Sequence, residues 1–418
     1  MKQIIRIFAF FLCTLLVGCA GHQKISNQLA QSLHENAPEI VLTQLSEIQP
    51  EARDMVQYQL NMGLLQLLSG QFDEAIVTLS SAKKEIQLVQ ATSITENIAA
   101  GSVSEVLRSY SGSPTDLVML HNILALSYLF NNDIDNARVE MLQADVSMKK
   151  LASKEALTGE LASTHLLSAI IYELLDEQSN ALISYRKVSE VMDKNDIALP
   201  VSLQKALLRM SAKLGATAQY RDYQKQFPQV HLSKNKNAGQ IFILYFDGVV
   251  SPKKQTSMMV PSFNGEQLIR IVLPAYPRLA SASTQAQVSF SQNTENTQLV
   301  ESIDSLARAD LKAQFPGILL ATTSRAVLKY QLVSQAHSAD PLLGLIANMA
   351  TVLTEVADLR SWNMLPANIQ FAYIDGPGEL LQISYPKHQI EKINIKQGSH
   401  NLLLINSLSD HIYHYQEE

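Results

Sequence analysis

Several short patterns bring nucleophilic residue types to spacings that could support catalysis. Ser251 and Lys254 have the S-x-x-K spacing, in which a lysine can activate a serine from the next helical turn. Pro252 and the apolar run before it favour a loop here, and the same spacing recurs elsewhere in the chain. The sequence has no G-x-S-x-G motif and no glycine-rich phosphate loop. We therefore predict no catalytic residue and no enzymatic activity.

Metal-binding residue types stand close together in two places. His411 and His414 are three residues apart, which would place two imidazoles together on a helix, but they lie near the end of the chain. Asp133 begins a run that starts like a calcium loop, yet the later glycine and glutamate of such a loop are missing. Helix capping explains that run better. We predict no metal site and no cofactor.

The sequence around Cys19 indicates where the protein is located rather than what chemistry it performs. A basic start and a short apolar run precede Val17-Gly18-Cys19, which is typical of a bacterial export signal. The end of this segment resembles the lipobox of bacterial lipoproteins. That resemblance implies cleavage before Cys19 and acylation of its thiol and its new amino group, and Ala20 implies sorting to the outer membrane. Because several acyl chains anchor a protein stably, we expect a lipid-anchored protein that faces the periplasm.

Composition limits the other partners. The chain has 418 residues and a formal net charge of −6, and it contains two cysteines. This length suggests two or three domains. The sequence has no lysine and arginine cluster, so we do not expect nucleic acid or anionic lipid headgroups as partners. Cys13 would leave with the signal, so a mature chain acylated at Cys19 could form no disulfide.

Residues 24–228 have helical periodicity with few prolines or glycines. Three windows place a small residue twelve positions before an alanine: Gly63 and Ala75, Ala125 and Ala137, Ala169 and Ala181. The pattern resembles the tetratricopeptide repeat (TPR), in which antiparallel helices approach closely through small residues. A degenerate fourth unit is expected from Leu203 to Phe227. The units are spaced more widely than the ~34 residues of regular repeats, so an irregular helical bundle is the alternative.

In a TPR array the inner helices line a concave groove. The residues that we expect to face this groove and bind a partner are Gln57, Leu60, Leu64, Asn122, Leu126, Leu129, Ser163, Leu166, Ile170 and Glu173. An apolar groove with a few amides suits a peptide or a partner helix. The alternative is that these leucines pack internally or against the C-terminal half.

The pattern changes after the polar segment 231–239. Short apolar runs predict strands at 241–246, 268–273 and 287–291, and again between 369 and 405. The region between these two groups is helical. There we expect Pro316 to begin a second helix and residues 342–357 to form a buried apolar helix.

Short sequence segments of the C-terminal half resemble those of an uncharacterised family of proteobacterial TPR-containing lipoproteins. They include Leu273-Pro274-Ala275-Tyr276 and Ala357-Asp358-Leu359-Arg360-Ser361-Trp362. The resemblance implies an architecture and a location but no activity. Arg360 and Trp362 are further candidates for partner binding, since arginine and tryptophan often anchor interfaces, although a lone tryptophan can equally fill a core.

We predict a signal peptide (1–18), an all-α TPR-like array (19–230) and an α+β domain (239–418) whose sheet is mainly antiparallel. The predicted function is that of an outer-membrane-anchored adaptor that binds envelope proteins through the groove. The alternative is a protein that binds the cell wall or a polysaccharide, peptidoglycan included, or an enzyme that acts on it.

Overall fold

The computed structural model describes residues 21–96, 108–155, 159–232, 238–261, 268–277, 283–353, 355–386 and 388–417. The predicted signal and Cys19 lie outside these ranges. Within them, no helix has the length and apolar character needed to cross a membrane.

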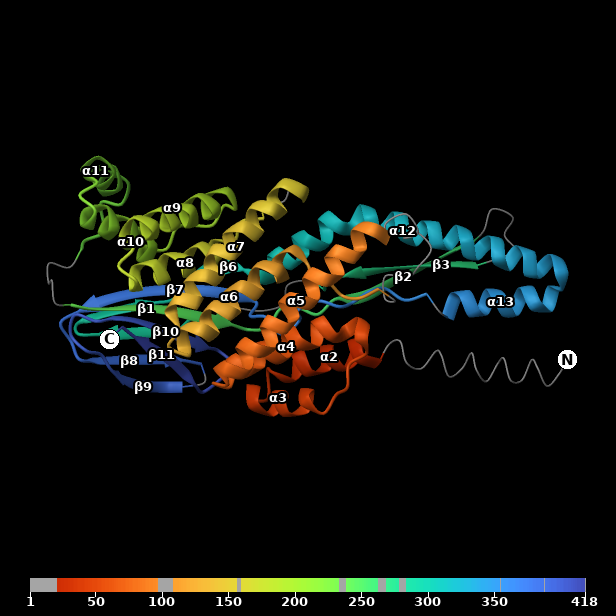
Figure 1. Cartoon of the computed structure of the whole chain (residues 1–418), viewed down its shortest axis with the longest axis horizontal. Helices are drawn as coiled ribbons and strands as arrows, with labels where there is room; N and C mark the ends of the chain where they lie inside the picture. The colour runs from red at the N-terminus through yellow and green to blue at the C-terminus, as the bar shows by residue number, and fades with distance from the viewer. Residues whose placement is uncertain are drawn as a thin grey trace.

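The described part of the first half contains helices and no strands (Figure 1). Two helices precede the repeats, and a short 3₁₀ helix, η1 (Ala52–Asp54), leads into them. The helices are α2 (Gly21–Ser32), α3 (Pro38–Ser46), α4 (Met55–Leu68), α5 (Phe72–Glu96), α6 (Pro114–Phe130), α7 (Ile134–Glu155), α8 (Ala162–Leu174), α9 (Gln178–Lys194), α10 (Val201–Lys213) and α11 (Thr217–Gln226).

Helices α4 to α11 form four successive pairs, and each pair packs on the next. Small residues lie where helices approach each other: a Cβ atom on Gly63 would stand 2.4 Å from Cγ of Leu79. The turn inside each pair contains a residue with positive φ, namely Gly70, Asn132, Asp176 or Gly215. In each turn, the residue that follows the one with positive φ donates its N–H to the carbonyl five positions earlier. This arrangement ends the first helix of the pair and gives a hydrogen-bond partner to a carbonyl that the helix itself leaves without one. The predicted TPR-like array is confirmed, including its fourth unit.

The described part of the C-terminal half contains three sheets, of five, four and two strands. The five-stranded sheet has the order β11-β10-β1-β7-β6, with only the β1–β10 pair parallel, and the four-stranded sheet has the order β5-β4-β8-β9. Their strands are β1 (Gly239–Asp247), β4 (Gln287–Phe290), β5 (Asn293–Asn296), β6 (Gln298–Ser302), β7 (Asn368–Gly376), β8 (Leu380–Tyr385), β9 (His388–Asn394), β10 (His400–Asn406) and β11 (Ile412–Gln416). The predicted α+β class with a mainly antiparallel sheet is confirmed.

The five-stranded sheet lies between the helices and the four-stranded sheet. On β1, Ile241, Ile243 and Tyr245 belong to the core shared with the second sheet. The alternating residues Phe242 and Leu244 belong to the core shared with the helices. Alternation along a strand sends neighbouring side chains to opposite faces, so both faces of this sheet are buried. One hydrophobic core therefore joins the helical half to the sheet half.

A separate projection, which we call the apolar arm, extends past the sheet at the end away from the C-terminus (Figure 1). It consists of β2 (Lys254–Pro261), β3 (Leu268–Ala275), residues 315–339 of α12 (Ile303–Ala339), and α13 (Pro341–Leu353). The strands pair with each other, α12 and α13 pack together, and both helices contact β3.

Two sequence predictions for this region are wrong. Helix α12 continues through Pro316, because this residue lies on an exposed side of the helix where water can satisfy the carbonyl it leaves without a partner. The apolar helix predicted at 342–357 is also not buried. Leu342 is 63% exposed and Leu345 is 58% exposed, because no element of the described chain covers that side of α13.

Candidate functional site

The concave face of the helical array is covered by the chain itself. All ten residues predicted to face the groove are buried, with exposures between 0% for Leu60 and 4% for Ser163. Helices α8 and α10 contact the five-stranded sheet on this side, and α6 contacts β11. The groove expected to receive a partner is therefore filled by the C-terminal half. This outcome corresponds to the alternative in which those leucines pack against the C-terminal half.

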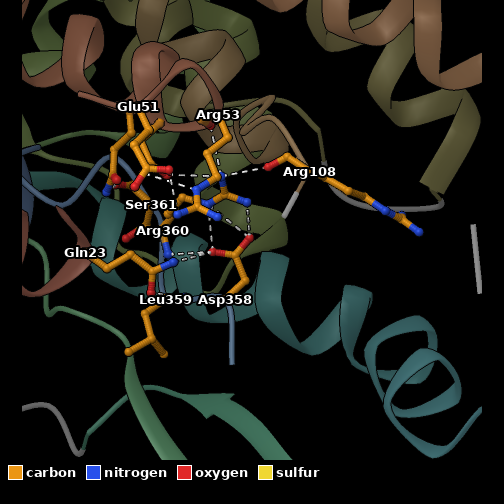
Figure 2. A network of polar contacts seen from close by, with 10 residues as sticks. Gln23, Glu51, Arg53, Arg108, Asp358, Leu359, Arg360 and Ser361 are labelled. Atoms are coloured by element: carbon orange, nitrogen blue, oxygen red, sulfur yellow. Dashed lines mark hydrogen bonds and ion pairs between the residues drawn. The ribbon is translucent and has the colours of Figure 1, made fainter. Parts of the chain in front are cut away.

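The C-terminal half also holds the beginning of each inner helix through a polar side chain. At α4 this side chain is Arg360, which is 2% exposed. Its Nη1 donates to the carbonyls of Arg53 (3.0 Å) and Arg108 (2.8 Å) and lies 3.2 Å from Oδ1 of Asp54 (Figure 2). Its Nη2 donates to Oδ2 of Asp358 at 2.7 Å. Although burial would lower the pKa of Arg360, the carboxylates of Asp358 and Asp54 raise it, so this side chain remains a buried cation.

The segment after Arg360 continues this junction. Gln57 donates to the carbonyl of Ser361 at 2.6 Å, and Asn61 donates to Oδ1 of Asn363 at 3.0 Å. Ser26 of α2 also donates to Oδ1 of Asn363, at 3.2 Å. Trp362 is 1% exposed within the shared core. Arg360 and Trp362 thus contact other parts of the same chain, and Trp362 has the core position that the sequence left open.

Carboxylates hold the next two inner helices. At α6, the backbone N–H of Thr115 donates to Oδ2 of Asp310 on α12 at 3.0 Å. At α8, the backbone N–H and the hydroxyl of Ser163 donate to Oε2 of Glu301 on β6, at 3.0 Å and 3.3 Å. The first N–H groups of a helix have no hydrogen-bond acceptor within the helix. Here the carboxylates of Asp310 and Glu301 accept hydrogen bonds from them.

Both carboxylates lie away from water, and this affects their ionisation. Burial raises the pKa of Glu301 to about 7, against the opposing effect of the bonds from Ser163. Burial likewise raises the pKa of Asp310 to about 6. Each group would otherwise be fully ionised at neutral pH, so each makes stability depend on pH.

The fourth inner helix, α10, is joined to the sheet through several contacts. The N–H of Val201 donates to Oε1 of Gln298 at 3.0 Å, and the N–H of Tyr373 donates to Oγ of Ser202 at 2.9 Å. Arg209 forms an ion pair with Glu173 and lies over the Tyr373 ring, 4.5 Å from its centroid. Glu173, which was predicted to face the groove, is thereby neutralised inside the junction.

A cleft of about 950 Å³ remains open beside this junction, between the helical array and α12. Its size suits an organic ligand or a chain segment. The charged side chains that line it are Lys83, Arg108, Lys150, Lys253 and Arg360, with Asp358 as the acidic member. Gln87, Gln90 and Gln314 add amide groups. Lys83 and Arg360 form ion pairs with Glu140, Asp54 and Asp358, but positive side chains still outnumber acidic ones along the described lining, although the whole chain has a net charge of −6.

One wall of the cleft carries a chain of hydrogen bonds. Oγ of Ser147 lies 3.2 Å from Nε2 of His121, and Nδ1 of His121 lies 2.7 Å from Oε2 of Glu140. Lys83 donates to the other oxygen of Glu140 at 2.6 Å. Burial would raise the pKa of Glu140, but the bonds from His121 and Lys83 outweigh it and hold this pKa below its ordinary value.

This order of groups is that of a serine–histidine–acid triad. Ser147 lies inside α7, however, where backbone N–H groups bond to carbonyls four residues earlier. The backbone beside Ser147 therefore provides no oxyanion hole of the kind that acyl transfer requires. The geometry favours a structural role in which this chain of bonds ties α5, α6 and α7 together.

The other candidate motifs also have structural positions. Ser251 lies in the loop after β1, where its N–H donates to Oδ1 of Asp304 at 2.7 Å, and Lys254 begins β2. His414 is on strand β11 and contacts Oδ1 of Asn401 at 2.9 Å, whereas His411 precedes that strand. Among the described residues, no group of three histidine, cysteine or acidic side chains has an arrangement that could hold a metal ion.

Sequence reasoning did not identify the cleft. Its walls come from α5, α6, α7, the loop before α6, and α12, which are far apart in the sequence. Arg360 is the only predicted partner-binding residue among those that line it. The available signal was the helical spacing of Lys83, Gln87 and Gln90 on one side of α5.

Comparison with models of known protein families and with curated protein sequences gave no match. Among solved structures, nine chains match. One is described as the crystal structure of the apo form of RapI, with 15% sequence identity and a TM-score of 0.34. The match covers 49% of this chain and 49% of that chain, so it spans about half of each. A TM-score this low assigns neither a fold nor a function.

Proposed function

We propose that this protein is an adaptor of the bacterial cell envelope, anchored to the outer membrane by acyl chains on Cys19 and facing the periplasm. In this proposal a segment of an envelope protein binds in the cleft between the helical array and α12. The observation that carries the proposal is the cleft itself, which is large, is lined by more positive than acidic side chains and lies next to the buried junction.

The chemistry of the cleft indicates the kind of partner. Lysine, arginine and glutamine side chains present N–H donors, which suit carboxylates and carbonyl oxygens. An acidic, extended segment of a protein supplies both groups. The concave face cannot serve this role while the sheet covers it, so the cleft replaces the groove as the partner surface.

The location is tested by fractionating cells that express the wild-type protein or the Cys19→Ser variant. We expect the wild type in the outer-membrane fraction, with a mass that includes the acyl chains, and the variant in the soluble fraction. An unmodified Cys19 in the wild-type protein would contradict the anchor.

The adaptor role is tested by replacing one charge in the cleft. We expect Lys150→Glu to lose an envelope protein that the wild type captures by chemical crosslinking in cells. Lys187→Glu is the matched control, because Lys187 lies on α9 outside the cleft and is 43% exposed. Equal capture by both variants would place the partner surface elsewhere.

A further inference from the structure

The apolar arm exposes more apolar surface than the rest of the described chain. More than half of the large apolar side chains that are exposed on the described residues lie in it. On α13, Leu342, Leu345, Ile346 and Met349 follow the spacing of one helical face, and they are 49% to 63% exposed. A continuous apolar surface of this kind on a soluble domain indicates an interaction site.

The charges of the arm make this surface compatible with lipid. Helix α12 has no acidic residue between Asp310 and Asp340, and α13 has no charged residue. Two of the arm's cations turn inward, where Arg325 and Lys329 both form ion pairs with Glu355. The outer face of α13 therefore combines apolar side chains with an absence of charge.

The position of the arm relates it to the predicted anchor. Helix α2, which begins at Gly21, contacts the segment that follows α13 (residues 355–359), which we call the base of the arm. Nε2 of Gln23 lies 3.5 Å from Oδ1 of Asp358, and Oε1 of Gln23 accepts a hydrogen bond from the N–H of Leu359 at 3.4 Å. Cys19 is four residues before Gln23, so acyl chains on it would begin at most about 14 Å away. An anchor at that point holds the base of the arm at the membrane surface.

We propose that the exposed apolar face of the arm, centred on α13, inserts into the lipid leaflet that holds the acyl anchor. The inference rests on the proposed anchor for its geometry, whereas its occupant, lipid acyl chains, follows from the apolar and uncharged character of α13. The part of α12 that belongs to the arm, residues 315–339, is about 38 Å long at 1.5 Å per residue, so the arm can place this contact well away from the sheets. The protein would thus hold the membrane at two points and keep one orientation on it.

The test uses the acylated protein in vesicles of phosphatidylethanolamine and phosphatidylglycerol. Acylation blocks the thiol of Cys19, so a cysteine introduced at one position can be labelled with an environment-sensitive fluorophore. The labelled cysteine replaces Ile346, which is 49% exposed on α13. In the matched control it replaces Ile183, which is 50% exposed on α9. We expect a blue shift, and quenching by spin-labelled lipid, at position 346 and neither effect at position 183.

Every other outcome either contradicts insertion of the arm or shows that the acyl anchor fails while the arm is still tested. The same spectrum at both positions on vesicle-bound protein would overturn it. A blue shift at 346 without vesicles that grows with protein concentration would also overturn it, since a second copy would then cover the face. If mass spectrometry finds Cys19 without lipid, the anchor fails. Vesicles added to that protein, with Cys19 replaced by serine so that only position 346 is labelled, still test the arm, because insertion at 346 supports it and no change refutes it.

Discussion

Ser163 and Glu301, one at the start of an inner helix and the other on an outer strand of the sheet, form a double hydrogen bond. The N–H and the hydroxyl of Ser163 both donate to Oε2 of Glu301, at 3.0 Å and 3.3 Å. Asp310 and Gln298 likewise accept a backbone N–H at the starts of α6 and α10, whereas Arg360 donates to the carbonyl of Arg53 just before α4. The C-terminal half therefore fixes the spacing of the helical array, and a groove that sequence reasoning left open is closed.

The buried carboxyl of Glu301 predicts how stability responds to pH. Burial raises its pKa from 4.5 to about 7 in the folded state, so the folded protein binds this proton more tightly than the unfolded chain. Its stabilising contribution is complete below about pH 4.5 and is lost as the pH rises through 7. We expect Glu301→Gln, which keeps the acceptor oxygen, to raise the free energy of unfolding at pH 8 by on the order of 2 kcal/mol.

Urea denaturation of the two proteins at pH 5 and pH 8 measures this effect. The advantage of Glu301→Gln should be smaller at pH 5, where the wild-type carboxyl is already largely protonated. Glu190→Gln, on an exposed part of α9, is the control and should change stability little at either pH. An advantage that does not change with pH would mean that Glu301 does not carry this dependence.

Arg360 should be among the most costly residues to replace. Removing its guanidinium takes a donor away from the carbonyls of Arg53 and Arg108 and from the carboxylates of Asp54 and Asp358 at the junction. We expect Arg360→Ala to lower the free energy of unfolding by about 3–5 kcal/mol, the usual cost of breaking a buried ion pair.

Thermal and urea unfolding provide the measurement for Arg360. Arg360→Lys keeps the charge but loses the planar set of donors, so an intermediate loss is expected. Arg221→Ala on the exposed surface of α11 is the control, with a change within ~0.5 kcal/mol. A loss of that small size for Arg360→Ala would contradict the role of the junction.

The two halves should not fold independently. Leu60, Leu126 and Leu166 of the array belong to the same hydrophobic core as Phe371 and Leu402 of the sheet. Separation would expose this surface to water, so we expect residues 19–230 alone to aggregate or to lose cooperative unfolding. Circular dichroism during heating and limited proteolysis test this, with the full chain as the control. A soluble fragment 19–230 with a sharp unfolding transition would show that the groove can exist uncovered.

The residues Ser147, His121 and Glu140 give a prediction about chemistry. If their bonds are structural, the full-length protein should not react with a fluorophosphonate probe for activated serines. We expect Ser147→Ala to cost less than about 1 kcal/mol, and His121→Ala to cost about 1–3 kcal/mol because it leaves the buried Glu140 with one donor fewer. Labelling that disappears in Ser147→Ala would instead establish a hydrolase and favour the enzymatic alternative.

The helical half could be predicted because its signals are local. Gly63, Ala125 and Ala169 each stand seven positions before the left-handed residue of a turn, so a pattern within thirteen residues identifies a helix pair. Strand β1 was predictable for the same reason, since its apolar run is continuous.

The site could not be predicted because its contacts are distant in the sequence. Gln57 and Ser361 are 304 positions apart, and Ser163 and Glu301 are 138 apart, so no periodicity relates them. Leu345 shows a second limit of prediction from sequence. Its apolar character predicts that something should cover it, but composition does not specify whether the covering group belongs to the same chain.

The most direct test of the account is photo-crosslinking in living cells from inside the cleft. A photoreactive amino acid replaces Gln87, an exposed residue of the cleft wall, and in the control it replaces Gln224, an exposed residue of α11. We predict that position 87 crosslinks to one envelope protein, that position 224 does not, and that Lys150→Glu weakens the crosslink at 87. The same partner at both positions, or no partner at 87, would contradict the proposal that the cleft receives the partner of this protein.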